Sequence, residues 1–237
     1  LAKIKSFEKT LAIKNINLPN NITVLKKINF DYILSINNTQ IFNQNFLNNF
    51  KKKIINYHYS LIPSYKGLYS CTKVLIKQEK FTGISWHYVT KKIDDGKIVY
   101  RKKIKIHNKD NAANLIIKLN TLCLSTFSSF ISNLKGKVII KNNEQIKDFN
   151  LMINKEKYST IDHLMKANEM LNTFKAFDYS PFKSPLPSIK INLDKNYIVK
   201  DIKLVPKQNN KKSPTKIGKN LFLIKSKDNK WLKIEIK

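Results

Sequence analysis

Short apolar runs alternate with amphipathic segments over the first 140 of the 237 residues. Four runs rich in β-branched and aromatic residues predict strands, at 30–36, 53–57, 82–89 and 98–106. Two amphipathic segments between them, 41–50 and 68–77, predict short helices. A longer apolar stripe, with a cap at Asp110 and a stop at Gly136, predicts one long helix. Strands that alternate with helices in this way predict an α/β fold.

The pattern changes after about residue 150. Ser159 and Asp162 have the spacing of a capping box and predict a helix that continues to Phe174. A proline-rich stretch at 181–187 follows. Three further runs, separated by polar turns, predict strands at 197–205, 221–224 and 231–236. Short strands with polar turns are typical of a small β-barrel-like module.

The composition narrows the class of protein. With 42% apolar and 11% aromatic residues, the chain can bury a core, which excludes global disorder. Its apolar runs are shorter than the roughly 20 residues that cross a bilayer, and its first residues do not resemble a signal segment. Cys71 and Cys123 predict neither a disulfide framework nor a metal site. We therefore expect a cytoplasmic protein with no membrane partner and no metal.

The net charge of +29 is weaker evidence for a nucleic-acid partner than its size indicates. Arg101 is the single arginine, although arginine is the residue best suited to bidentate phosphate and guanine contacts. Abundant Lys, Asn and Ile are typical of AT-rich coding, so a solvated surface is the first interpretation. The segment 197–237 nevertheless holds 12 Lys against three acidic residues. Non-specific RNA contact through this C-terminal module stays open.

Candidate chemistry begins at the end of the second predicted strand, where open α/β sheets place their ligand crevices. Asn56 and His58 are two positions apart, so their side chains point to the same side of an extended segment. An amide and an imidazole side by side can polarise a carbonyl and stabilise the oxyanion formed when an amine attacks it. The imidazole can also relay a proton near neutral pH. Asp94, on the turn after the next strand, can favour the charged imidazole.

Each of these features also has a structural interpretation. An Asn-x-His pair is common in capped turns, and Asp94–Gly96 is a common hairpin turn. Ile84, Trp86 and Tyr88 alternate with polar positions along the third predicted strand, so His87 is predicted to be a packed or edge histidine. His107 and His163 have no partner at a useful spacing.

In combination, three segments resemble the folate-dependent formyltransferases. NYHYSLIPSYKG at 56–67, FTGISWH at 81–87 and IDDGKIV at 93–99 follow, in order, the family's Asn-x-His-x-Ser-Leu-Leu-Pro, Thr-Gly-Val-Thr-x-His and Asp-x-Gly-x-Ile patterns. The resemblance runs from Phe30 to about Lys137. It implies a Rossmann-like domain that uses 10-formyltetrahydrofolate as co-substrate, without a metal.

The resemblance also implies roles for residues. Asn56 would hold the formyl oxygen, His58 would stabilise the tetrahedral intermediate, and Asp94 would tune His58 and relay protons through water. The implied folate contacts are Ser35, Ile36, Asn37, Val89, Thr90, Ile93 and Asp95. The loop positions on the acceptor side would be Ser60, Pro63 and Gly67.

The same resemblance divides the chain into three parts. These are a catalytic domain at 1–150, a helix and proline-rich linker at 151–188, and an OB-like subdomain at 189–237. Family members open with a glycine-containing strand and helix that would precede Leu1, so the catalytic domain is expected to be N-terminally incomplete. Because that strand is central in a doubly wound sheet, its absence would expose strand edges and part of the folate pocket.

The motifs leave the acceptor amine open. The segments 68–70 and 84–87 look most like members that work with peptide- and polyketide-synthetase modules, which favours an aminoacyl group on a carrier protein. Initiator methionyl-tRNA is compatible with the lysine-rich tail, and sugar nucleotides also stay open. The rival class is a catalytically decayed family member or a basic module that binds RNA.

Overall fold

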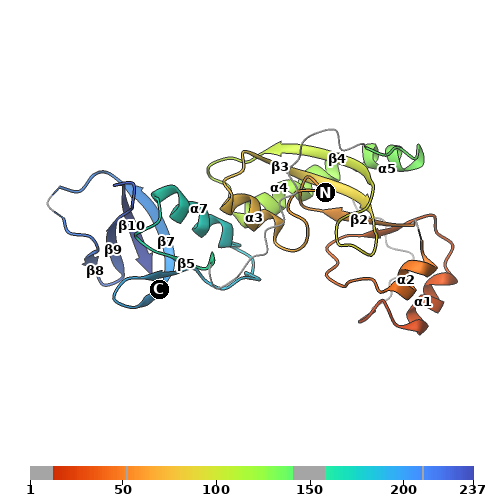
Figure 1. Cartoon of the computed structure of the whole chain (residues 1–237), viewed down its shortest axis with the longest axis horizontal. Coiled ribbons are helices and arrows are strands. Elements are labelled where there is room, and N and C mark those ends of the chain that lie inside the picture. The colour runs from red at the N-terminus through yellow and green to blue at the C-terminus, as the bar shows by residue number, and fades with distance from the viewer. Residues whose placement is uncertain (1–12, 52, 141–157, 210) are drawn as a thin grey trace.

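The computed structural model describes residues 13–51, 53–140, 158–209 and 211–237. A four-stranded sheet and a six-stranded sheet lie toward opposite ends of an elongated molecule, with helix α7 (Ala167–Phe177) between them (Figure 1). Two short N-terminal helices, α1 (Pro19–Lys26) and α2 (Gln44–Asn49), extend the end that holds the four-stranded sheet.

The first sheet has the strand order β1-β2-β3-β4. Its strands are β1 (Ile33–Ser35), β2 (Ile54–His58), β3 (Phe81–Tyr88) and β4 (Ile98–Lys105). β1 and β2 are parallel and joined through α2, whereas β2, β3 and β4 pair antiparallel. The predicted α/β class is confirmed, with a mixed sheet. The register places Asn56 directly opposite His87.

The core lies where α4 (Ala112–Ser125) packs on β3 and α5 (Phe127–Lys135) packs on β4. Trp86 on β3 is fully buried and stacks on Phe130 with ring centroids 4.1 Å apart. The alternation along 82–89 correctly predicts a strand, but the polar positions do not mark an exposed face. Ser85 and His87 are as buried as their apolar neighbours, because α4 and α5 cover one face and the polar loops around the site cover the other.

The single long helix predicted from Asp110 to Gly136 is instead the pair α4 and α5, bent by 53°. Thr126 separates them, and its hydroxyl donates to the Leu122 carbonyl at 2.6 Å, a local bond of the kind that bends helices. The cap is Asn111, whose side chain accepts the Asn114 N–H, and not Asp110. Among the described residues no single helix is long and apolar enough to cross a membrane, although this bent pair together has such a length and composition.

The N-terminal helices form a second, smaller core beside the first sheet. Ile22 of α1, Phe46 of α2, Phe50 and Ile54 are buried against one another. Phe46 stacks on Phe42 with ring centroids 4.8 Å apart. This packing holds the segment between β1 and α2 over the carboxyl ends of the strands.

The second sheet has the order β5-β6-β7-β10-β9-β8. Its strands are β5 (Thr160–Ile161), β6 (Lys190–Asn192), β7 (Asn196–Val205), β8 (Thr215–Gly218), β9 (Leu221–Lys225) and β10 (Trp231–Ile236). The order runs from β5 at one edge to β8 at the other, so the OB-like barrel stays a prediction, as do the three domain boundaries. The boundary near residue 150 lies outside the described residues.

The helix predicted to begin at Ser159 and Asp162 begins later, at Ala167. Ser159 precedes β5, and Asp162 accepts the N–H of Leu164 in the turn that follows. Glu169 accepts the N–H of the residue before α7, and the carboxylate of Asp228, on the β9–β10 hairpin, accepts the Ala167 N–H at 2.8 Å. The second sheet therefore supplies a cap for α7.

α7 joins the two halves by packing on α3 (Ser70–Ile76) and on β7. The Thr72 hydroxyl of α3 donates to the Ala176 carbonyl and contacts the Tyr179 hydroxyl at 2.8 Å. The linker that follows α7 is thus fixed against the first half of the chain.

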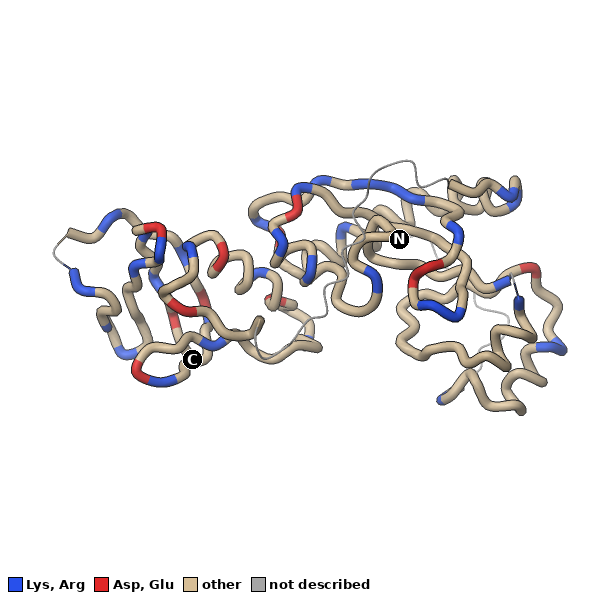
Figure 2. The backbone as a smooth tube through the Cα atoms, viewed as in Figure 1, with Lys and Arg blue, Asp and Glu red and all other residues tan. Residues whose placement is uncertain are grey.

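Basic residues are spread over both halves and follow one another closely along edge strand β4 (Figure 2). Lysines on an edge strand discourage pairing with another sheet.

Candidate active site

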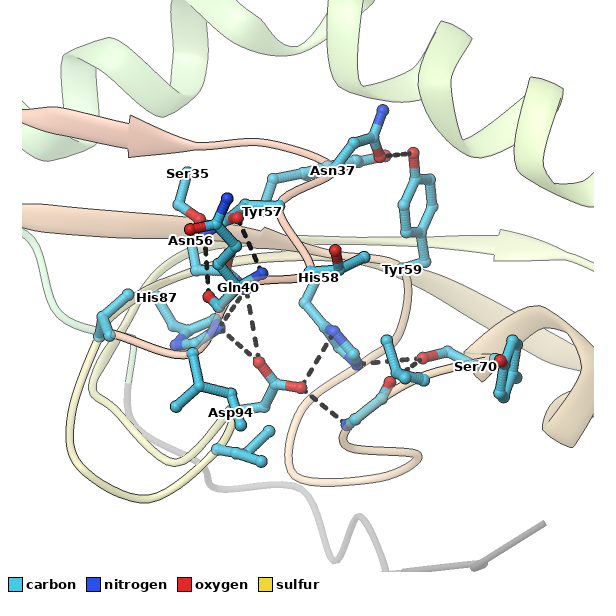
Figure 3. A pocket seen from close by; sticks show the side chains of 18 of the residues that line it. Ser35, Asn37, Gln40, Asn56, Tyr57, His58, Tyr59, Ser70, His87 and Asp94 are labelled. Atoms are coloured by element: carbon cyan, nitrogen blue, oxygen red, sulfur yellow. Dashed lines mark hydrogen bonds and ion pairs between the residues drawn. The ribbon is translucent and has the colours of Figure 1, made fainter. Parts of the chain in front are cut away.

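A cavity of about 640 Å³ lies at the carboxyl ends of β1 and β2. Its walls come from the segment after β1, the end of β2, the start of α3, the β3–β4 loop, α4 and the linker after α7. The volume lies within the range of roughly 300–1,000 Å³ that is usual for small-molecule sites. The polar side chains of Asn56, His58, His87 and Asp94 meet at its floor (Figure 3).

The Asp94 carboxylate is the centre of this polar cluster. Its Oδ2 lies 3.2 Å from His58 Nδ1 and accepts the Gly67 N–H at 2.7 Å. Its Oδ1 lies 3.3 Å from His87 Nε2 and 3.4 Å from Asn56 Nδ2. The structure thus brings together the three residues that the sequence singled out for catalysis, and it adds His87 to them (Figure 3).

Local backbone geometry places Asp94 against β2. Asp94 itself has φ +49°, in the left-handed region that costs a non-glycine residue energy and is enriched at functional sites. A Cβ at Gly96 would lie 1.7 Å from the Tyr88 carbonyl oxygen, so the turn closes this tightly only because residue 96 is glycine. The turn therefore folds back onto the end of β3 and directs the carboxylate toward His58.

His58 is buried between acceptors on both sides of its ring. Nδ1 faces Asp94, and Nε2 lies 3.1 Å from the Tyr65 carbonyl oxygen and 3.2 Å from the Ser70 hydroxyl. A ring with two acceptor partners suits the imidazolium form. Burial acts in the opposite direction and lowers the pKa of His58 below its usual value, although Asp94 opposes this change. Contacts at both ring nitrogens thus fix the orientation of the imidazole.

Asp94 stays ionised in this environment. Burial alone would raise its pKa, but the hydrogen bond from His87, the charge of His58 and the Gly67 N–H together hold the pKa of this carboxyl well below its usual range. The side chain is only 9% exposed, so these interactions are weakly screened by solvent. The cluster therefore contains a permanent buried anion beside a titratable ring.

His87 was predicted to be a packed or edge histidine, and the structure adds a polar role to its burial. Its Nδ1 bonds to the Tyr88 carbonyl at 2.9 Å, while Nε2 lies 3.2 Å from Asn56 Nδ2. These contacts orient both the Asn56 amide and the Asp94 carboxylate. His87 lies opposite Asn56 because of the strand register, which the alternation along β3 does not reveal. In the sequence, the one sign of a role for His87 is its place at the end of the Thr-Gly-x-x-x-His pattern.

The remaining predicted site residues divide into two groups. Those that line the cavity are Ser35, Asn37, Gly67, Val89, Thr90 and Ile93. Those that do not line it are Ile36, Ser60, Pro63 and Asp95. Ser60 is fully buried and donates to the Ser64 carbonyl, and Asp95 pairs with Lys66 at 2.6 Å. Gln40, at the end of the segment 35–40 that the resemblance places along the folate pocket, also lines the cavity. Lining residues that the sequence did not indicate include Tyr59, Tyr69, Asn120, Tyr179 and Pro185.

In the part of the chain that the structure describes, no group of three or more His, Cys, Asp or Glu side chains is arranged to hold a metal ion. The two cysteines, Cys71 and Cys123, are free and buried. Burial raises the pKa of the Cys71 thiol to about 12, so this thiol, which lines the cavity, is a poor nucleophile.

The fold is shared with known transferases. A structure of WlaRD, a sugar 3N-formyl transferase crystallised in the presence of dTDP and 5-N-formyl-THF, superposes with a TM-score of 0.66 at 20% identity, over 86% of this chain and 72% of that one. An N-formyltransferase from Helicobacter canadensis, in complex with folinic acid and dTDP-3-aminofucose, superposes with a TM-score of 0.61 at 19% identity, over 86% and 73% of the two chains. This likeness defines the class of fold, a Rossmann-like α/β domain.

A protein-family model described as formyl transferase matches residues 4–129, more than half of the chain. The chain belongs to the formyl transferase family. It is 36% identical over 169 residues to the bifunctional polymyxin resistance protein ArnA of Wigglesworthia glossinidia brevipalpis, and 30% identical over 203 residues to the methionyl-tRNA formyltransferase of Mycoplasmopsis pulmonis. These alignments cover 69% and 84% of this chain, and 25% and 64% of the two relatives, so the chain spans less than two thirds of either relative.

Proposed function

We propose that this protein transfers a formyl group from 10-formyltetrahydrofolate to a primary amine. The observation that carries the proposal is the convergence of Asn56, His58 and Asp94 at the floor of one cavity. A rival function, a decayed member or a basic module that binds RNA, gives no reason to keep a buried anion between two imidazoles. Membership of the formyl transferase family supports the same reaction.

The cavity fits the co-substrate in size and in the nature of its walls. Val89 and Ile93 offer apolar contacts on the β3–β4 loop, and the segment from Asn37 to Phe42 also lines the cavity. Backbone and apolar groups arranged in this way suit a flat heterocycle with hydrogen-bonding edges. When bound, 10-formyltetrahydrofolate supplies an activated formyl carbonyl.

The residues at the floor would divide the chemistry among them. The contact of Asn56 with Asp94 is long, at 3.4 Å, so the amide can turn a hydrogen toward the formyl oxygen and stabilise its developing charge. His58 takes the proton that the attacking amine releases and returns it toward the leaving nitrogen. Asp94 stabilises the imidazolium during this transfer, because it lies 3.2 Å from Nδ1.

We propose methionyl-tRNA as the first acceptor to test. The methionyl-tRNA formyltransferase of Mycoplasmopsis pulmonis aligns with 84% of this chain, so the likeness extends beyond the catalytic motifs into the second half. Basic residues on both halves would attract the phosphates of a nucleic acid without reading its sequence (Figure 2). The carrier-bound aminoacyl group and the sugar amine remain the comparison acceptors.

The test supplies the purified chain with 10-formyltetrahydrofolate and, in separate reactions, methionyl-tRNA, a carrier protein loaded with an amino acid, and an amino-sugar nucleotide. Mass spectrometry then detects the N-formyl product. We expect product from methionyl-tRNA, its loss in His58→Gln, and unchanged turnover in the control His163→Gln, whose exposed ring lies outside the cavity. The absence of formyl product from all three acceptors would overturn the proposal, and product from another acceptor would overturn only the choice of methionyl-tRNA.

A further inference from the structure

Lys73, on the short helix α3, is buried although nothing in its sequence surroundings predicts this. Its side chain is only 5% exposed, whereas lysines are among the residues least often buried. The ammonium donates to the Lys66 carbonyl oxygen at 2.6 Å. Burial lowers the pKa of Lys73, and the negative charge of Asp94 opposes that change. A buried cation thus lies close to the catalytic cluster without lining the cavity.

The bond to Lys66 acts on Asp94 through a single peptide group. The Lys66 carbonyl and the Gly67 N–H belong to one planar peptide, in which the oxygen and the hydrogen point in opposite directions. Lys73 holds the oxygen end at 2.6 Å, and Asp94 Oδ2 accepts from the hydrogen end at 2.7 Å. A cation on the carbonyl both fixes the plane of this peptide and polarises its N–H toward the carboxylate.

The same loop also holds His58. The Tyr65 carbonyl lies 3.1 Å from His58 Nε2, two residues before the Gly67 N–H that reaches Asp94. Tyr65 has a φ of +58°, in the left-handed region that costs a non-glycine residue energy, so contacts from outside the loop help to keep this shape. Lys73 supplies such a contact by donating to the carbonyl of Lys66, the residue between Tyr65 and Gly67.

We propose that Lys73 is a positioning residue for the catalytic pair: through the Lys66–Gly67 peptide it fixes Asp94 against His58. The inference rests on the proposed function for its kinetic consequence, while its effect on His58 can be measured separately. Because Lys73 does not line the cavity, its removal alters the rate of transfer more than the binding of folate.

The charge of Lys73 also has a defined direction of effect. The charged or titratable groups that act on His58 are Asp94 from the β3–β4 loop, His87 from β3 and Lys73 from α3. Asp94 raises the pKa of His58, whereas His87 and Lys73 lower it. Replacing the Lys73 ammonium by a neutral group therefore moves the pKa of His58 upward.

Two variants of the full chain separate the charge from the hydrogen bond. Lys73→Met keeps the bulk of the side chain and removes both, whereas Lys73→Gln removes the charge and keeps an N–H donor. Lys175→Met is the matched control, because the Lys175 ammonium is also partly buried and donates to a backbone carbonyl, that of Asn108 at 2.7 Å, away from the cavity. Each protein is assayed for kcat and KM, for the pKa of His58 by imidazole NMR, and for thermal unfolding.

In Lys73→Met we expect kcat to fall about 10- to 100-fold with little change in the KM for folate, because the pair is misplaced rather than the cavity reshaped. We expect the His58 pKa to rise in Lys73→Gln, because the charge is lost while the donor still holds Asp94 in place, and to rise less in Lys73→Met, because a misplaced Asp94 raises it less. We also expect a smaller loss of kcat in Lys73→Gln, and neither effect in Lys175→Met. A His58 titration that is unchanged in both Lys73 variants would overturn the inference, even if they unfold at lower temperature.

Should Lys73→Met fail to fold, Lys73→Gln decides by the same titration. If the unmodified chain transfers no formyl group, the proposed function fails and the His58 titration still tests the effect of Lys73.

Discussion

Replacing Asp94 by Asn tests the electrostatic core of the site with almost no change in shape. The carboxylate accepts from Gly67 and faces His58 with one oxygen, and it meets Asn56 and His87 with the other. An amide keeps only one of these oxygens. If that oxygen remains with Gly67 and His58, the new NH₂ group faces the NH₂ group of Asn56. Both groups are hydrogen-bond donors, so the contact between Asn56 and residue 94 is lost.

The expected size of the effect follows from these contacts. A hydrogen bond to a charged group contributes about 1–3 kcal/mol, so Asp94→Asn lowers the free energy of unfolding by roughly that amount and the melting temperature by roughly 2–12 °C. Without the carboxylate, His58 loses the partner that stabilises its imidazolium. The loss in formyl transfer is about 10²- to 10⁴-fold, or about 3–5 kcal/mol of transition-state stabilisation.

The assay follows the initial rate of N-formyl product at saturating folate, together with thermal unfolding of the same samples. Asp110→Asn is the control, because Asp110 is also buried and accepts the His107 N–H at 2.8 Å, but lies outside the cavity. We expect the control to lose stability and to keep its activity. Formyl transfer by Asp94→Asn as fast as by the unmodified protein would show that the carboxylate is not needed for catalysis.

Three further outcomes follow from particular contacts. Tyr179→Phe removes the hydroxyl bonded to Thr72, and we expect a loss of about 1 kcal/mol in unfolding free energy by chemical denaturation. Asp228→Asn removes a charged cap of α7. The α7 backbone N–H and neighbouring donors lower the pKa of Asp228 from 3.8 to about 2, so its stabilising effect is complete above pH 3.8 and disappears as the pH falls through 2. The difference in melting temperature from the unmodified protein should therefore shrink over that interval. Gly96→Ala forces a Cβ against the Tyr88 carbonyl, and we expect the displaced turn to abolish transfer, measured by product formation, while much of the circular dichroism signal remains.

The strand positions were predictable because local chemistry decides them. The predicted strands at 53–57, 82–89 and 98–106 each agree with β2, β3 and β4 to within one residue at either end. Their apolar and β-branched residues are buried whichever neighbours they pair with. The predicted strand at 30–36 is shortened to the three residues of β1.

Helix ends were less predictable, since competing polar side chains decide them. The apolar stripe of α4 and α5 continues across Thr126, so periodicity alone gave one helix. Asp110 and Asn111 are adjacent and both are good caps, and only the structure shows which one accepts the helix N–H. In the second half, Ser159 and Asp162 had the right spacing, but pairing of β5 with β6 keeps that segment extended.

The site was partly predictable for a similar reason. Asn56 and His58 share a strand, so their common orientation follows from sequence spacing. The contact of His87 with Asn56 depends on how β2 and β3 align, and the burial of Lys73 involves its contact with the loop at 65–67. These contacts depend on how separate segments meet in the folded chain, so local pattern does not reveal them.

In the proposed reaction His58, held between Asp94 and the Tyr65 carbonyl, moves the proton during formyl transfer. The most direct measurement compares the pH dependence of kcat/KM with the pKa of His58 determined by imidazole NMR on the same free protein. We expect that the acidic limb of the rate profile coincides with this pKa, that both lie below 6.5, and that the limb disappears in His58→Gln. An acidic limb that stays unchanged in His58→Gln, or that differs from the titration of the ring, would contradict this role of His58.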